Sequence, residues 1–266
     1  MKIAVIGAGN GGQSIAGFLA LQGHEVCLYD INSQKINTLK QQGGIQLTGC
    51  IKGFGKIDCF TTNIGEAVKD AEIIMVTTIA NAHYAVAESL APYVRDGVTI
   101  ILNPGRTCGA LVFKQALKKS GVNSQYYLGE AQTLVYACRL ICNGQVNIIG
   151  IKDRVPLAAL PASDTDYVIE KIRPIYPCFQ KADNVLCTSL ENIGSIFHPC
   201  VCLFNAATIE RQDQFWFYRD MTTQVANFIE KFDAERLAVG KAYGIDLLSV
   251  NEWIKFAYKD TQGDTL

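Results

Sequence analysis

Glycines near the start of the chain have the spacing of a phosphate-binding turn. Gly7, Gly9 and Gly12 follow the pattern G-x-G-x-x-G, and Asn10 and Gly11 lie between them. The first glycine permits a tight turn, the second lets the backbone approach a pyrophosphate, and the third lets a helix pack closely on a strand. The N–H groups and the positive dipole end of that helix favour an anion. We therefore expect these five residues to bind a dinucleotide.

The elements around this turn stand in the order that such a site needs. An apolar run over 3–6 predicts a buried strand, and helical periodicity over 11–22 predicts a helix that ends at Gly23. A second apolar run leads to Asp30, roughly 20 residues after Gly12, where the acid that binds the adenosine ribose is expected. A carboxylate there accepts hydrogen bonds from the ribose hydroxyls and repels a 2′-phosphate. This predicts NAD as cofactor, with NADP disfavoured; the alternative is a glycine-rich turn that binds no nucleotide.

The segments that follow alternate between strand and helix. Apolar runs over 72–76 and 98–102 predict further strands, separated by a helix over about 82–93. This alternation predicts an α/β fold with a doubly wound parallel sheet of the Rossmann type. Ligands bind beyond the carboxyl ends of such strands. That rule adds Thr78, Asn103 and Gly105 to the predicted cofactor site.

The pattern changes along the chain and predicts two domains. Extended segments at 125–128, 133–136, 146–149 and 185–187, with a helix over 167–175, complete a dinucleotide-binding domain over 1–188. Long helices over 190–210 and 221–243 then dominate, so residues 189–266 are expected to form an α-helical substrate and catalytic domain.

The three histidines are the candidates for proton transfer near neutral pH. His24 follows Gly23 and is expected at the surface. His83 lies just after a strand end, near the expected cofactor, and a role in starting the helix is the alternative. His198 stands inside a predicted helix directly before Pro199, which predicts a kink that turns the imidazole toward a cleft. His198 is the predicted catalytic residue, and a satisfied core histidine is the alternative.

Composition excludes several classes of protein. Lys and Arg total 24 against 25 Asp and Glu, which excludes a nucleic-acid partner on charge. No apolar stretch is long enough for a membrane span and no export signal is visible, so a cytoplasmic location is expected. The ten cysteines, Cys27 and Cys59 among them, are expected to be mostly small buried hydrophobes, and their spacing predicts no metal site.

Several phrases of the sequence together resemble the octopine/nopaline (opine) dehydrogenase family. They are GAGNGGQSIAGFLALQGHEVCLYD, ILNPGRTCGALVF, GEAQTLVYACR, SLENIGSIFHP and FDAERLAVGKAYGI. The resemblance covers nearly the whole chain. It implies that an amino acid and an α-keto acid form an imine that NAD(P)H reduces to a secondary amine.

The resemblance also implies roles for individual residues. His198 matches the family's catalytic histidine, and Asn103 to Gly105 match a loop close to the nicotinamide. Glu130, Gln132 and Arg139 fall in the third phrase without an assigned role; Arg139 suits either a substrate carboxylate or a structural ion pair.

One departure from the family pattern concerns catalysis. Family members continue past the last phrase into a segment that carries an arginine and an aspartate paired with the histidine. Asp233 and Arg236 stand in a different motif and are expected to be helix-surface and interhelix residues. Together with the polar end at 259–266, this predicts a truncated helical domain. A chain of this kind is expected to bind NAD but to condense its substrates slowly or not at all.

Two other functions remain open on the sequence. One is a simple hydroxy-acid dehydrogenase of the same two-domain plan, and the other is an NAD-binding module without catalysis. The identities of the amino acid and the keto acid stay open, as does the oligomeric state, a homodimer included. The aromatic run over 215–218 suits either a substrate pocket or packing between domains.

Overall fold

The computed structural model describes residues 1–217 and 220–257. Tyr218 of the aromatic run and the polar end over 259–266 lie outside the described residues. Contacts between residues divide the chain into two units, Met1–Ser189 and Leu190–Leu266.

The first unit is built on a sheet of eight strands in the order β12-β11-β8-β7-β6-β1-β2-β5. All neighbours pair in parallel except β11 with β8. The strands are β1 (Lys2–Ile6), β2 (Glu25–Tyr29), β5 (Cys59–Thr61), β6 (Ile73–Val76), β7 (Thr99–Leu102), β8 (Tyr127–Ala131), β11 (Val155–Ala159) and β12 (Phe179–Lys181). The predicted α/β fold with a doubly wound, mostly parallel sheet is confirmed.

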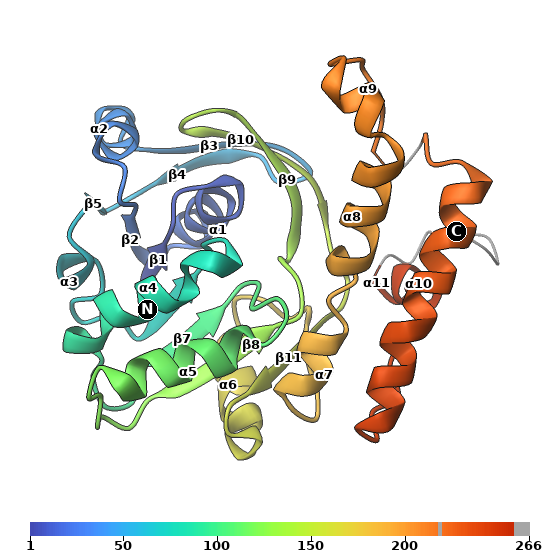
Figure 1. Cartoon of the computed structure of the whole chain (residues 1–266). Coiled ribbons are helices and arrows are strands. Elements are labelled where there is room, and N and C mark those ends of the chain that lie inside the picture. The colour runs from blue at the N-terminus through green and yellow to red at the C-terminus, as the bar shows by residue number, and fades with distance from the viewer. Residues whose placement is uncertain (218–219, 258–266) are drawn as a thin grey trace. The chain divides into compact units, whose positions relative to one another are not determined.

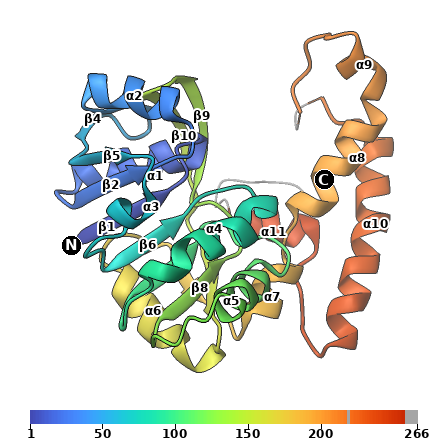
Figure 2. The ribbon, with the colours of Figure 1, turned by 60° about the vertical axis from the view of Figure 1, so that its left-hand side comes forward.

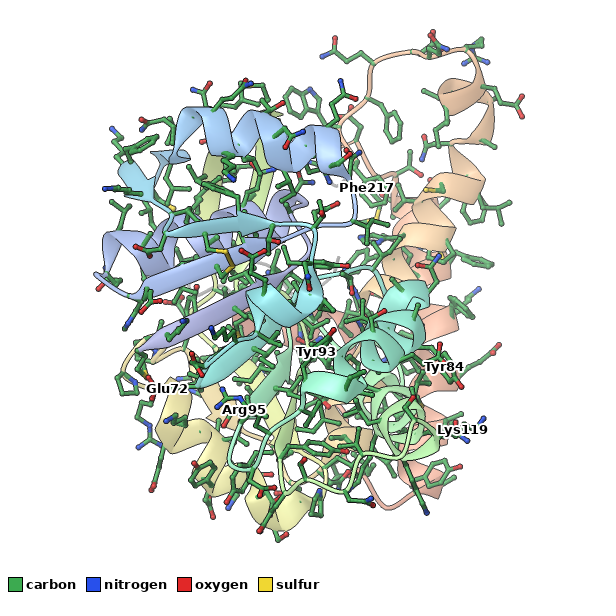
Figure 3. The ribbon with its side chains drawn as sticks, turned by 90° about the vertical axis from the view of Figure 1, so that its left-hand side faces the viewer. Glu72, Tyr84, Tyr93, Arg95, Lys119 and Phe217 are labelled. Atoms are coloured by element: carbon green, nitrogen blue, oxygen red, sulfur yellow. A yellow bond between two sulfur atoms is a disulfide. The ribbon has the colours of Figure 1, made fainter. Side chains whose placement is uncertain are left out.

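Helices cover both faces of this sheet (Figure 1). Along β1, Ile3 and Val5 pack with residues of α1 and α6, whereas Ala4 and Ile6 pack with residues of α3, α4 and α5. On that second face, the Lys119 ammonium of α5 lies 5.8 Å from the ring centre of Tyr84 on α4 (Figure 3). The helices are α1 (Asn10–Leu21), α2 (Ser33–Gln42), α3 (Ile64–Ala67), α4 (His83–Leu90), α5 (Gly109–Lys119) and α6 (Thr165–Ile172), with 3-10 turns η1 (Ala80–Ala82), η2 (Ala91–Tyr93) and η3 (Ala162–Asp164).

A second sheet lies over α1 (Figures 1 and 2). Its order is β4-β3-β10-β9, with strands β3 (Gly44–Gly49), β4 (Gly53–Lys56), β9 (Tyr136–Cys142) and β10 (Gln145–Ile151). The amide of Gln13 on α1, which is fully buried, donates to Asn143 Oδ1 and accepts the N–H of Gly144. This amide fixes α1 to the β9–β10 turn. Helix α1 is therefore enclosed between two sheets.

The second unit is helical. It contains α8 (Gly194–Phe204), α9 (Ala206–Glu210), α10 (Thr223–Ala242) and α11 (Val250–Ala257). Its core is a small cluster that includes Ile196, Val201, Ile229 and Val250. Within the described residues, no helix has the length and apolar character that crossing a membrane requires.

Two predicted elements near the start of the helical part were wrong. Residues 185–187 are not extended but begin helix α7 (Val185–Leu190), because Asn184 Oδ1 accepts the N–H groups of Leu186 and Cys187. The predicted helix over 190–210 is divided among α7, α8 and α9. Asn205 lies between α8 and α9, and its side chain donates to the Val201 carbonyl.

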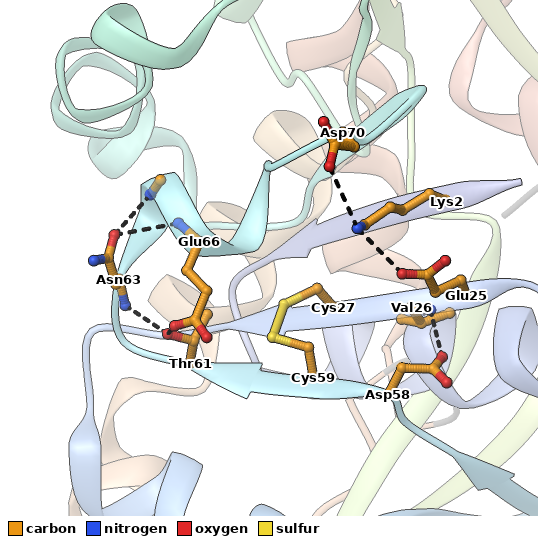
Figure 4. Close-up of a disulfide and its surroundings, with 11 residues drawn as sticks. Lys2, Glu25, Val26, Cys27, Asp58, Cys59, Thr61, Asn63, Glu66 and Asp70 are labelled. Carbon is orange, nitrogen blue, oxygen red and sulfur yellow. Dashed lines mark hydrogen bonds and ion pairs between the residues drawn. A yellow bond between two sulfur atoms is a disulfide. The ribbon is translucent and has the colours of Figure 1, made fainter.

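Cys27 and Cys59 form a disulfide rather than two free buried thiols (Figure 4). They are direct partners in the parallel pairing of β2 with β5, and their Cα atoms lie 4.3 Å apart. The sequence could not reveal this pairing, since it depends on which strand lies beside β2. The bond joins the strand that ends before Asp30 to the edge strand of the main sheet.

Candidate functional site

The predicted phosphate-binding turn lies at the carboxyl end of β1, between β2 and β6. Gly7 has φ +103°, a conformation that other residues rarely adopt. A Cβ on Gly12 would lie 1.7 Å from the Gly7 carbonyl oxygen, so α1 reaches this turn only because residue 12 is glycine. The Thr77 hydroxyl at the end of β6 lies within hydrogen-bond distance of the Ile6 and Gly7 carbonyls and fixes the turn to the sheet.

The first turn of α1 is open on the side where an anion would bind. Its N-cap, Gly9, makes no side-chain capping bond, and a Cβ on Gly9 would meet nothing within 4 Å. The other side is closed, because Asn10 Oδ1 accepts the N–H of Leu140 and Gly11 lies against the Leu134 side chain. An open helix N-terminus with glycine at its cap fits a dinucleotide pyrophosphate.

Asp30 lies at the carboxyl end of β2, beside the turn. Its Oδ2 accepts the N–H of Ala8 at 2.8 Å and the Lys35 ammonium at 3.0 Å, and its Oδ1 accepts the N–H of Asn32 at 2.9 Å. Burial opposes ionisation, but the bonds from Asn32, Ala8 and Lys35 outweigh it and lower the pKa of Asp30. The carboxylate is therefore charged and fixed next to the glycine turn.

Polar groups without partners gather at the carboxyl ends of β6 and β7. In the described part of the chain, eight buried side-chain nitrogen or oxygen atoms have no hydrogen-bond partner, and five of them belong to Thr78, His83 and Asn103. An unpaired buried polar atom costs roughly 1–3 kcal/mol. Their concentration at the edge where the cofactor is expected fits a ligand rich in hydrogen-bonding groups.

His83 is the first residue of α4 and is fully buried. Burial lowers the pKa of His83, and the nearby charge of Arg106 lowers it further. The Thr78 backbone raises the pKa in part, although its distance and angle to the imidazole do not meet the criteria of a hydrogen bond. The imidazole is therefore neutral.

The residues left without a role in the third phrase have different surroundings. Glu130 on β8 is fully buried, and burial raises its pKa against the hydrogen bonds from Thr188, Ala110 and Ser189. Gln132 is buried just beyond β8, and its N–H donates to the Pro156 carbonyl. Arg139 is exposed on β9.

Lys152 is a buried charge that is not among the residues predicted for the site. Its Nζ donates to the Leu134 carbonyl at 2.8 Å, and burial lowers its pKa to about 8. Its position at the end of the apolar run over 146–151 was the available signal. Through Leu134, which packs on Gly11, it supports the wall beside the glycine turn.

His198 lies on α8 in the helical unit, as predicted, and is exposed. Its ring makes an edge contact with Phe217 at 5.4 Å between ring centres. Asn192 is buried nearby in the sequence, and its carbonyl accepts the Ser195 hydroxyl.

Asp233 and Arg236 are not surface residues. Both are buried on α10, with a 2.7 Å ion pair between Asp233 Oδ1 and Arg236 Nε. Asp233 also accepts the N–H of Val250, and Arg236 donates to the carbonyls of Leu190 and Leu248. These bonds join α10 to the segments on both sides, so the pair is structural and interhelical.

A shallow hollow elsewhere on the first unit is lined by residues 65, 68–70 and 92–95, among them Tyr93 and Arg95 (Figure 3). None of the predicted site residues lines it. It plays no part in the candidate site.

Comparison with known proteins identifies the family. Residues 181–266 match the model of the α-helical domain of NAD/NADP octopine/nopaline dehydrogenase, and residues 2–102 match that of coenzyme F420-dependent NADP oxidoreductase. The opine dehydrogenase of Arthrobacter sp. (strain 1C) is 38% identical over 257 residues, which cover 96% of this chain and 71% of that protein. The chain belongs to the opine dehydrogenase family. It is thus an NAD(P)-dependent oxidoreductase acting on CH–NH donors, and the family reaction condenses an amino acid with a keto acid reductively.

Solved structures of the opine dehydrogenase type share its fold. Octopine dehydrogenase in complex with NADH and agmatine has a TM-score of 0.79 at 19% identity, covering 99% of this chain and 71% of that one. Yersinopine dehydrogenase with NADP+ bound has a TM-score of 0.72 at 16% identity, covering 93% and 65%. One of these two structures contains NADH and the other NADP+. The family to which the chain belongs assigns it to NAD(P) as a class.

Proposed function

We propose that this opine dehydrogenase prefers NAD to NADP and uses His198 for proton transfer in the condensation of an amino acid with an α-keto acid. The observation that carries the cofactor preference is the fixed, charged carboxylate of Asp30 beside Ala8. A carboxylate in this place binds the two hydroxyls of the adenosine ribose and repels a 2′-phosphate.

The proposed cofactor site runs along the carboxyl edge of the main sheet. The glycine turn holds the pyrophosphate, Asp30 holds the adenosine ribose, and polar groups after β6 and β7 face the nicotinamide end. The bound cofactor supplies or accepts a hydride. The proposed binding residues are Gly7, Gly9, Asn10, Gly11, Gly12, Asp30, Thr78, Asn103 and Gly105.

His198 is proposed as the group that moves protons. Attack of the amino nitrogen on the keto carbon, with loss of water, gives an imine. Addition of a hydride to its carbon and of a proton to its nitrogen then gives the secondary amine. Loss of water requires a proton on the departing oxygen, and the amine must first lose its own. An exposed imidazole can take and return that proton. The helical domain, proposed over 189–266, would then carry the substrates.

Fluorescence titration of the purified protein with NADH and NADPH tests the cofactor assignment. We expect tighter binding of NADH in the parent, and an Asp30→Ala variant that loses NADH affinity and its preference over NADPH. Asp58→Ala is the matched control, because Asp58 accepts the N–H of Val26 near the amino end of β2, whereas Asp30 follows its carboxyl end. Equal affinities in the parent would remove the NAD preference.

NADH oxidation with pyruvate and a panel of amino acids tests the reaction. We expect oxidation that depends on the amino acid and is lost in His198→Ala, while His24→Ala keeps it and both variants bind NADH like the parent. Oxidation that is equally fast with the keto acid alone would favour a simple hydroxy-acid dehydrogenase. NADH binding without turnover in the panel would favour a non-catalytic module.

A further inference from the structure

Glu130 is a fully buried acid that the proposed reaction does not use. It lies on β8 directly opposite Leu102 of β7, one residue before Asn103. A buried carboxyl is costly unless its oxygens are hydrogen-bonded, and both oxygens of Glu130 are. Where those bonds lead indicates what the residue does.

Both oxygens hold the far end of the loop that follows β7, residues 103–109. Oε2 accepts the N–H of Ala110, the second residue of α5, at 2.7 Å. Oε1 lies 2.9 Å from the Ser189 hydroxyl, and this hydroxyl in turn accepts the N–H of Cys108 at 2.9 Å. The end of the loop is therefore attached to Glu130 once directly and once through Ser189.

The Glu130 side chain also lies against the middle of the same loop. A Cβ on Gly105 would lie 2.2 Å from Glu130 Cγ. A Cβ on Gly109 would lie 3.5 Å from Glu130 Oε2 and 3.1 Å from His83 Nδ1. Gly105 therefore allows the loop backbone to approach the acid more closely than another residue would, whereas the tight contact at Gly109 is with His83. The contact between Glu130 and the loop therefore involves the Cγ atom of the side chain as well as the carboxyl group.

The loop has a backbone that needs such support. Arg106 has φ 62° and Cys108 has φ 60°, left-handed values that cost a residue with a side chain roughly 1 kcal/mol or more. The loop begins at Asn103, whose two amide atoms are buried without partners. A strained loop that starts with an unsatisfied amide persists only when its surroundings hold it in place.

The surroundings of Glu130 favour a carboxyl group that carries a proton. The single proton of the Thr188 hydroxyl can be donated either to Glu130 Oε1 at 2.6 Å or to the Val185 carbonyl at 3.1 Å, so these distances are compatible with either state of the acid. The groups that act on the Glu130 pKa include no cation, and a buried carboxylate without a paired cation is costly. An uncharged carboxyl keeps its bonds to Thr188, Ser189 and Ala110 without a buried charge.

We propose that Glu130 is an uncharged positioning residue that holds the 103–109 loop in the form that receives the nicotinamide end of the cofactor. This rests on the proposed cofactor site. The acid acts through the backbone of the loop and through Ser189, not by contact with the cofactor. The adenosine end, held by the glycine turn and Asp30, is attached to other strands and is independent of it.

Calorimetric titration with NADH and with ADP-ribose, which lacks the nicotinamide, tests the proposal. We expect Glu130→Ala to weaken NADH binding by about tenfold, the equivalent of one lost hydrogen bond, and to leave ADP-ribose binding within about twofold. Glu130→Gln keeps the same shape without a charge and is expected to bind NADH like the parent. Ser189→Ala removes the link from Cys108 to Glu130 Oε1 but leaves the bond to Ala110, and it is expected to show a smaller loss of the same kind.

A matched control separates positioning from general destabilisation. Thr165→Val removes another buried side-chain bond of the same unit, to the N–H of Ala159, away from the loop. It should lower the melting temperature without changing the affinity for NADH or for ADP-ribose.

The positioning role would be overturned if Glu130→Ala lost NADH and ADP-ribose binding equally, or lost neither. The uncharged state would be overturned if Glu130→Gln bound NADH as weakly as Glu130→Ala. If Glu130→Ala does not fold, Ser189→Ala and Glu130→Gln decide the same questions. A parent that binds neither ligand refutes the cofactor site itself.

Discussion

The two units differ in how their polar side chains relate to their cores. In the first unit, apolar side chains on both faces of an eight-stranded sheet form two large clusters, and the unpaired polar groups of Thr78, His83 and Asn103 lie at one edge. In the helical unit the apolar cluster is small, and the Asp233–Arg236 ion pair lies among the helices. Large apolar side chains are exposed there, including Leu203, Phe204, Trp216, Phe228 and Tyr243.

This difference shows where each unit obtains its stability. Extensive packing in the first unit can offset the cost of leaving polar atoms unpaired for a ligand. The helical unit has less apolar burial, so removing one partner of its ion pair should destabilise it strongly. We therefore expect mutations to separate nucleotide binding from the stability of the helical unit.

The largest effect is expected from Asp233→Ala. It leaves the Arg236 charge buried without its carboxylate and should lower the free energy of unfolding of the helical unit by about 3–5 kcal/mol. Calorimetric melting should show an earlier transition for that unit, with ADP-ribose binding unchanged. Glu235→Ala, an exposed acid on the same helix, is the control. A parallel loss of ADP-ribose binding would show that the adenosine site depends on the helical unit.

Gly12→Ala and Gly9→Ala are a matched pair for the first unit. The Gly12 variant places a Cβ against the Gly7 carbonyl and should cost about 3 kcal/mol of unfolding free energy. Gly9 has open space at its Cβ position, so the same change should leave stability within about 0.5 kcal/mol. It should nevertheless weaken NADH binding, because the methyl group occupies the place of the pyrophosphate. Urea unfolding and NADH titration measure the two effects, and equal stability losses would contradict this account of the turn.

A pH dependence is expected from Glu130. Because burial raises its pKa, the folded protein keeps a proton that the unfolded chain releases above about pH 4.5, the ordinary value. Stability therefore falls as pH rises through this window, by at most ~1.4 kcal/mol per pH unit. Glu130→Gln lacks this term, so its stability relative to the parent should increase with pH in urea titrations. Thr165→Val should show a constant difference, and a constant difference for Glu130→Gln would mean that the acid is charged.

The smallest effect concerns the cofactor preference. Lys35 lies 3.0 Å from Asp30 and partly offsets the repulsion of a 2′-phosphate. Lys35→Ala should weaken NADPH binding a few-fold more than NADH binding, and added salt should reduce this difference. Lys40→Ala, on the exposed side of α2, is the control. Equal changes in both affinities would show that Lys35 takes no part in the preference.

Local sequence signals predicted the parallel sheet and the position of its first turn, because Gly7, Gly12 and Asp30 act through spacing along one short segment. The hydrogen-bond partners of Glu130 could not be predicted from the sequence. Ala110, Thr188 and Ser189 are distant from it along the chain and meet it only when α5 and α7 pack against β8. Asp233 and Arg236 were expected to be helix-surface and interhelix residues, and only the surface part of that expectation was wrong. Helical periodicity shows which residues share a face but not which face other segments cover.

The sheet that encloses α1 has a consequence for how the chain folds during synthesis. Strand β3 pairs with β4 on one side and with β10 on the other, so residues 44–49 find their second partner only after residues 145–151 have left the ribosome. Until then β3 and β4 lie against α1, but the apolar contribution of Val146 and Ile148 to this cluster is missing. The segment 2–102, although it matches a family model alone, should therefore not fold as an independent domain. Its nucleotide site should become protected from proteases only when the chain has grown past residue 151, which limited proteolysis of nascent chains of increasing length would detect.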